Sequence, residues 1–213
     1  MCNGCIEIIG LPLLQRYFDT LKQNSKPIVS VGSGIGTVEK YLDVNDSVIC
    51  VDPDPFSYQI FELEPELSHL PDYEYVEDLI KDNPGLVSNC NIFLNWPNPT
   101  IGKNECTFDI ESIELLKPEI LLIVMERTGG AGSYALAGSI MSLIPIFDNK
   151  TIPEKYHYLP NLENYNLLWH TSSIDCFTSD DKYIFSYLLL VRKDVNIKPV
   201  SYTHLTLPTT PYV

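Results

Sequence analysis

The stretch IVSVGSGIGTVEKYL (Ile28–Leu42) decides the fold, because it sets a short apolar run directly against three glycines spaced two residues apart. The apolar, β-branched run before the glycines is typical of a parallel strand that is buried on both faces. The residues after the glycines, TVEKYL, predict a helix, and SVICVD (Ser47–Asp52) predicts a second buried strand. The stretch therefore predicts a β-α-β unit.

Strands and helices alternate over most of the remaining chain. Further strands are predicted at 73–78, 90–96 and 119–126, and helices at 11–25, 56–64, 107–116 and 133–144. Two strand-like runs at 164–174 and 182–193 lie too close together for a crossover helix. The pattern predicts an α/β fold with a Rossmann-like, doubly wound, mostly parallel seven-stranded sheet and a C-terminal antiparallel hairpin.

The length of 213 residues suits a single domain, which we expect over residues 1–199. Residues 145–165 are rich in proline and aromatic side chains without periodicity, so they predict a lid-like loop. Residues 200–213 begin with VSYTHLTLPTT, which resembles a translated sequencing adapter, because adapter codons spell Val200–Thr209. We expect this stretch to be a non-native tail that takes no part in the fold.

The chain is acidic, with 28 acidic against 14 basic residues and a formal net charge of −14. Such a field repels phosphate backbones and favours neutral or cationic partners. The lysines and arginines are scattered singly, so no basic cluster marks a nucleic-acid site. The composition therefore disfavours a nucleic-acid partner.

No apolar run approaches the roughly 20 residues of a membrane helix, and no signal peptide is recognisable. We therefore expect a cytoplasmic protein without a membrane partner. Cys50 and Cys90 fall inside apolar runs and are expected to be buried free thiols. The histidines share no ligand spacing with cysteines or acids, so no metal site is predicted.

The glycine turn follows the first strand, at the edge of a parallel sheet where ligands bind. Glycine permits a positive φ and lets a ligand approach the backbone, while the following helix offers unpaired N–H groups. Asp52 closes the second strand twenty residues after Gly32 and can accept both hydroxyl hydrogens of a ribose. A tight strand-to-helix turn with a local cap at Asp52 is the alternative.

Together, VSVGSGIGTVE and VICVDPDP resemble the first two motifs of class I S-adenosylmethionine-dependent methyltransferases. The resemblance extends to about Arg192, because this superfamily also ends its sheet with an antiparallel strand beside the fifth. No subfamily is recognised. The resemblance implies S-adenosylmethionine as the cofactor and a cofactor site at Gly32, Ser33, Gly34, Gly36, Asp52, Pro53 and Asp78.

Within this pattern the glycines surround the methionine part of the cofactor and Asp52 meets the ribose. Asp78 matches the acidic position that often meets the adenine amino group, although a helix cap explains it equally well. Pro53 is placed to pack on the adenine ring.

The methyl acceptor is expected beside the fourth strand, where Asn95-Trp96-Pro97-Asn98 follows the apolar run. This sequence is similar to the Asn/Asp-Pro-Pro-aromatic motif of amino-nitrogen methyltransferases, but it departs from that motif at Trp96 and Asn98. The resemblance places Asn95 as a hydrogen-bond acceptor. Trp96 offers a flat wall that can stack on the substrate or face a cation, and Glu126, which closes the fifth strand, is a candidate base or cation binder. A stiff turn and a mobile helix-starting loop are the corresponding structural alternatives.

The resulting hypothesis is a methyltransferase with a small-molecule or protein acceptor. A nicotinamide-dependent oxidoreductase is the first alternative, although the spacing G-x-G-x-G differs from the dinucleotide pattern G-x-G-x-x-G. A methyltransferase-like binding scaffold that has lost methyl transfer is the second alternative. The sequence indicates neither the acceptor nor the oligomeric state.

Overall fold

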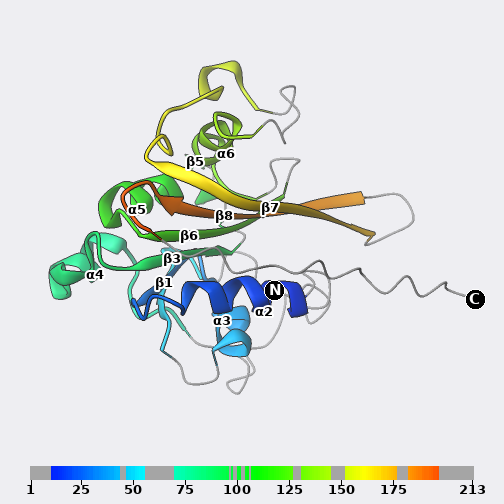
Figure 1. Cartoon of the computed structure of the whole chain (residues 1–213). Helices are drawn as coiled ribbons and strands as arrows, with labels where there is room; N and C mark the ends of the chain where they lie inside the picture. The colour runs from blue at the N-terminus through cyan, green and yellow to red at the C-terminus, as the bar shows by residue number, and fades with distance from the viewer. Residues whose placement is uncertain are drawn as a thin grey trace, which may run out of the picture.

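A six-stranded sheet runs through the centre of the structure, with helices on both of its faces (Figure 1). The structure, a computed structural model, describes residues 11–43, 47–55, 70–95, 97, 100–101, 104–105, 107–126, 131–144, 152–176 and 182–196. The sheet consists of β1 (Ile28–Val31), β2 (Ile49–Val51), β3 (Asn91–Asn95), β6 (Ile120–Glu126), β7 (Tyr165–Cys176) and β8 (Lys182–Arg192).

The strand order is β2-β1-β3-β6-β8-β7. The first four of these strands are parallel to one another, whereas β8 is antiparallel to both β6 and β7. The prediction of an α/β fold is confirmed in its coarser form, as a mixed sheet of six described strands. An antiparallel strand lies beside β6, as the resemblance to class I methyltransferases implies. The connection between β7 and β8 falls outside the described residues.

Two groups of helices cover the two faces of the sheet. Helices α2 (Leu11–Leu21) and α3 (Thr37–Leu42) pack on one face, and α4 (Val76–Asp82), α5 (Phe108–Leu116) and α6 (Tyr134–Met141) pack on the other. Neighbouring strand residues alternate between the two cores, so that Phe93 packs with α2 while Ile92 and Leu94 pack with the second group. Because both faces of the sheet are buried, these strands are continuously apolar and do not alternate between apolar and polar residues.

The predicted β-α-β unit is present as β1, α3 and β2. Its two strands pair in parallel from Val29 with Ile49 to Val31 with Val51, and all four residues of β1 are buried. The carboxyl ends of β1 and β2 therefore lie side by side, and the glycine turn and Asp52 follow directly from them.

The strand predicted over Tyr73–Asp78 is wrong, and the described sheet has six strands instead of seven. Only Tyr73 continues the sheet, through a single parallel bridge to Val51, and helix α4 begins at Val76. The spacing of Val76 and Leu79, both buried, directs one side of a helix towards the core. Packing of that helical side outweighs the strand propensity of the tyrosines before it.

Smaller elements complete the described structure. They are the 3-10 turns η2 (Pro84–Leu86) and η3 (Glu154–Tyr156) and the short antiparallel pair β4 (Thr100–Ile101) and β5 (Asn104–Glu105). Cys50 and Cys90 are buried free thiols as predicted, and burial raises the pKa of Cys90 to about 12. None of the helices within the described ranges is long and apolar enough to cross a membrane.

Candidate functional site

The glycine turn between β1 and α3 has a left-handed backbone at each of its glycines. The φ angles are 76° at Gly32, 58° at Gly34 and 66° at Gly36. L-residues with a Cβ rarely adopt this region, which explains the choice of glycine at all three positions. The turn is tied back to the sheet, because the N–H of Gly32 donates to the carbonyl of Val51 at 2.8 Å.

The space beside the turn differs between Gly32 and Gly34. A Cβ on Gly32 would lie 3.0 Å from Cα of Pro97 and 3.2 Å from Cζ of Phe108. A Cβ on Gly34 would have nothing within 4 Å. The space beside Gly32, where the sequence predicts that a ligand approaches the backbone, is therefore occupied by Pro97 and Phe108. The open side of the turn lies at Gly34.

Asp52 lies against this open part of the turn. Its Oδ2 accepts the N–H of Gly34 at 2.7 Å and its Oδ1 accepts the N–H of Asp54 at 2.8 Å. The side chain is 9% exposed, and burial raises the pKa of its carboxyl although both N–H donors lower it. Each carboxylate oxygen keeps lone-pair capacity for a further donor. Pro53, the next residue, is half-buried.

Asp78 lies apart from this group. It is exposed in the first turn of α4 and does not end a strand. It is not the helix cap that the sequence left open either, because Tyr75 is the N-cap of α4; an acidic residue in the first turn is favourable for the helix dipole. The prediction that Asp78 ends the third strand is therefore wrong.

Asn95 ends β3 beside the glycine turn, because Val31 and Leu94 are register partners and Gly32 follows Val31. The Asn95 side chain is 1% exposed, and within the described part of the chain neither its Nδ2 nor its Oδ1 has a hydrogen-bond partner. The Ser33 hydroxyl, also buried, has no partner there either. Buried polar groups are nearly always satisfied, so these groups are candidates for hydrogen bonds to a ligand or to ordered water.

Two further predicted residues are incompletely described. Trp96 lies outside the described residues. Glu126 is the last residue of β6, where its backbone is the register partner of Phe185, but its side chain is not described. The structure brings the end of its strand to the same edge of the sheet as Asn95, which is the partner of Val124.

Asp109 is a buried acid that sequence reasoning missed. It lies in the first turn of α5 with 0% exposure, and its oxygens accept the N–H of Ser133, the Ser133 hydroxyl and the N–H of Ile110, each at 2.7 Å. Ser133 caps α6 by accepting the N–H of Leu136 at 3.0 Å. Asp109 thus anchors Ser133, the N-cap of α6.

We expect Asp109 to make stability depend on pH near neutrality. Burial raises the pKa of Asp109 from 3.8 to about 6, although the hydrogen bonds from Ser133 lower it. Because the folded protein holds this proton more tightly than the unfolded chain, the stabilising contribution is present below pH 3.8 and is lost as the pH rises through about 6. Relative to Asp109→Asn, the wild-type free energy of unfolding should fall by about 1 kcal/mol between pH 5 and pH 7.

Urea denaturation of both proteins across this pH range measures the difference directly. The asparagine does not titrate, and the other acids cancel in the comparison. A difference between the two proteins that stays constant with pH would contradict the raised pKa.

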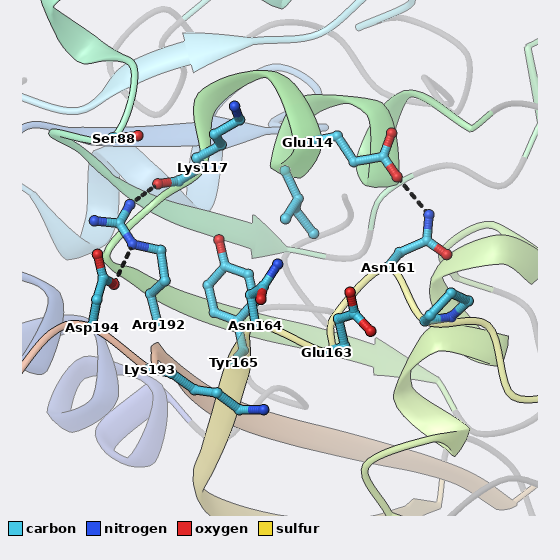
Figure 2. Close-up of a pocket in the computed structure, with 12 residues that line it drawn as sticks. Ser88, Glu114, Lys117, Asn161, Glu163, Asn164, Tyr165, Arg192, Lys193 and Asp194 are labelled. Atoms are coloured by element: carbon cyan, nitrogen blue, oxygen red, sulfur yellow. Dashed lines mark hydrogen bonds and ion pairs between the residues drawn. The ribbon is translucent and has the colours of Figure 1, made fainter.

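The cavity in Figure 2 lies away from the glycine turn, near the amino ends of β3 and β6. It measures about 790 Å³. Its lining carries three basic and three acidic side chains, namely Lys117, Arg192, Lys193, Glu114, Glu163 and Asp194. Arg192 is already engaged, because Nε donates to Asp194 at 2.7 Å and Nη1 donates to the carbonyl of Lys117 (Figure 2). The balanced charge selects no ionic ligand, so the cavity does not compete with the glycine turn as the candidate site.

Part of the predicted lid-like region is closely packed. The described residues 152–164 include η3, and a Cβ on Gly138 of α6 would lie 1.7 Å from the carbonyl oxygen of Tyr156. The N–H of Leu159 also donates to the carbonyl of Gly138 at 3.2 Å. This segment therefore packs directly on the backbone of α6.

No family model and no curated protein matches this chain. Among solved structures, it is similar to the methyltransferase domain of bacterial CtHen1-CN, with a TM-score of 0.46 and 11% identity over 86% of this chain and 99% of that one. A candidate RNA methyltransferase from Pyrococcus horikoshii gives a TM-score of 0.37 and 13% identity over 89% and 84% of the two chains. A SAM-dependent methyltransferase from Aquifex aeolicus gives a TM-score of 0.40 and 13% identity over 89% of this chain and 93% of that chain. These similarities say nothing about the reaction or the substrate of this chain.

Proposed function

We propose that this chain is an S-adenosylmethionine-dependent methyltransferase that binds its methyl donor at the glycine turn and Asp52. The observation that carries the proposal is the 2.7 Å hydrogen bond from the N–H of Gly34 to Oδ2 of Asp52, at the carboxyl ends of two adjacent parallel strands. This edge of a doubly wound sheet is where nucleotide-like ligands bind. The antiparallel strand β8 beside β6 supports a methyltransferase over a dinucleotide enzyme.

The residues present fit such a donor. The open side of Gly34 leaves room for a ligand against the backbone, and the unpartnered hydroxyl of Ser33 offers it a hydrogen bond. In our proposal Asp52 accepts hydrogens from the ribose hydroxyls with its remaining lone pairs, while Pro53 packs on the adenine ring. Gly32 and Gly36 shape the turn. Asp78 is left out of the proposed site because it is exposed on α4.

Bound S-adenosylmethionine supplies a methyl group that is already activated for displacement, so the protein chiefly has to align the acceptor and exclude water. We assign the alignment to Asn95, whose buried amide has a free acceptor and free donors within the described structure. Trp96 is proposed as a wall of the acceptor site and Glu126 as a base or cation binder. A small-molecule or protein acceptor fits the net charge of −14 better than a nucleic acid does.

Isothermal titration calorimetry with S-adenosylmethionine and, separately, NADH tests the donor. The wild type should bind S-adenosylmethionine, and Asp52→Ala should weaken binding at least about tenfold, because a buried carboxylate that accepts ligand hydroxyls is lost and the turn is released. Asp54→Ala is the matched control, since the Asp54 backbone N–H remains and only a neighbouring carboxylate is removed. Its affinity should stay within about twofold of the wild type.

Two outcomes would replace the proposal. Binding of NADH in place of S-adenosylmethionine by the folded protein would favour the oxidoreductase. Binding of S-adenosylmethionine without transfer of a labelled methyl group into any component of a host lysate would favour the scaffold.

A further inference from the structure

Three segments of the candidate site are joined in one chain of contacts. The N–H of Gly132, which precedes the α6 cap, donates to the carbonyl of Pro97 at 2.7 Å. Pro97 in turn packs on the glycine turn, since a Cβ on Gly32 would lie 3.0 Å from its Cα. Gly32, Pro97 and Gly132, which follow β1, β3 and β6, are therefore linked by close contacts of their backbones.

Asp109 holds one end of this series of contacts in place. It holds Ser133, the neighbour of Gly132, by two hydrogen bonds of 2.7 Å. Gly132 has a φ of 83°, and a Cβ there would lie 3.2 Å from Leu136 and 3.4 Å from Met125, so the backbone is closely confined. Phe108, directly before Asp109, touches the same glycine turn that Pro97 touches. The first turn of α5 thus contacts the turn on one side and the segment after β6 on the other.

We propose that Asp109 is a positioning residue of the site: acting through Ser133 and Gly132, it fixes the carbonyl of Pro97 and so holds Pro97 against the glycine turn where the donor binds. The role in donor binding rests on the proposed function, whereas the mechanical link does not. A purely structural acid would stabilise α6 without affecting the segment after β3. The two roles therefore differ in what happens at Gly132 and Pro97 when the bonds to Ser133 are removed.

The experiment compares Asp109→Asn and Ser133→Ala with Ser139→Ala. Ser139 is an equally buried serine of α6 whose hydroxyl donates to Ala135 and stays away from this chain of contacts. Amide hydrogen exchange measured by NMR reports on the Gly132 N–H, and calorimetry reports on S-adenosylmethionine. We expect exchange at Gly132 to rise at least tenfold in the first two variants and to stay unchanged in Ser139→Ala, with affinity falling about tenfold only in the first two.

Ser133→Thr keeps the hydroxyl and should retain both properties, which distinguishes loss of the bond from loss of packing. Unchanged exchange at Gly132 in both Asp109→Asn and Ser133→Ala would overturn the mechanical link. Faster exchange at the Gly132 N–H in Asp109→Asn and Ser133→Ala, combined with an S-adenosylmethionine affinity equal to that of Ser139→Ala, would overturn the positioning role. A wild type that binds no S-adenosylmethionine refutes the proposed function, and the exchange result then decides the link by itself.

Discussion

Replacing Gly138 with alanine is expected to lower the free energy of unfolding by about 3 kcal/mol or more, because the new methyl group has no room. Its position would be 1.7 Å from the carbonyl oxygen of Tyr156 and 2.8 Å from the carbonyl carbon. Both are backbone atoms, so no side-chain rotation relieves the overlap. Either α6 or the segment that contains η3 has to move, and the hydrogen bond from Leu159 to Gly138 is lost with it.

Gly85→Ala is the matched control for this substitution. A Cβ at Gly85 would have no atom within 4 Å, so the same chemical change should leave stability unchanged or raise it by about 0.5 kcal/mol. Urea denaturation of the two variants and the wild type gives the comparison. Equal stabilities for the two variants would show that residues 152–164 do not pack on α6 in solution.

Alanine substitutions at the two asparagines of β3 are expected to have opposite effects on stability and function. Asn91 is fully buried, and its Nδ2 donates to the carbonyl of Leu21 at 2.6 Å while its Oδ1 accepts the N–H of Ile120 at 3.2 Å. Asn91→Ala leaves buried partners unsatisfied and should cost about 3 kcal/mol. Asn95→Ala removes an amide that has no partner in the described structure, so the cost should stay below about 1 kcal/mol.

Methyl transfer should show the reverse order. If Asn95 aligns the acceptor, labelled transfer by Asn95→Ala should fall at least about a hundredfold while the affinity for S-adenosylmethionine is retained. Asn91→Ala, measured at a temperature where it is folded, should keep its activity. A strong loss of stability in Asn95→Ala would mean that its amide is engaged in the folded protein and has no need of a ligand.

The main parts of the fold could be predicted because periodicity and spacing are local properties. The β-α-β unit and strands β3, β6, β7 and β8 follow from apolar runs bounded by glycine, proline and polar residues. The prediction of a third strand was wrong, because the tyrosines of this stretch favour extended structure, whereas the residues further along it form the buried side of α4. Which of the two tendencies prevails depends on the core that receives Val76 and Leu79.

The candidate site could be predicted in part, for the same reason. Asp52 follows a strand that the sequence places beside the glycine turn, and the structure brings the two into contact. Asp109 gave no such signal, because an acid in the first turn of a helix usually faces solvent. Its partner Ser133 is distant in sequence, and only the packing of α5 beside the segment after β6 brings them together. The close contact of Pro97 with Gly32 is likewise a tertiary effect.

The position of β8 constrains how the protein can be made. β8 is the last strand of the described chain, yet it lies inside the sheet, and β7 joins the sheet only through it. During synthesis on the ribosome, β2, β1, β3 and β6 can assemble while β6 still presents an open edge. An open edge recruits other strands, and pairing between distant segments is slow. A chain released before Lys182–Arg192 lacks the strand that pairs with β6 and joins β7 to the sheet, so we expect it to aggregate more readily than a chain that contains β8.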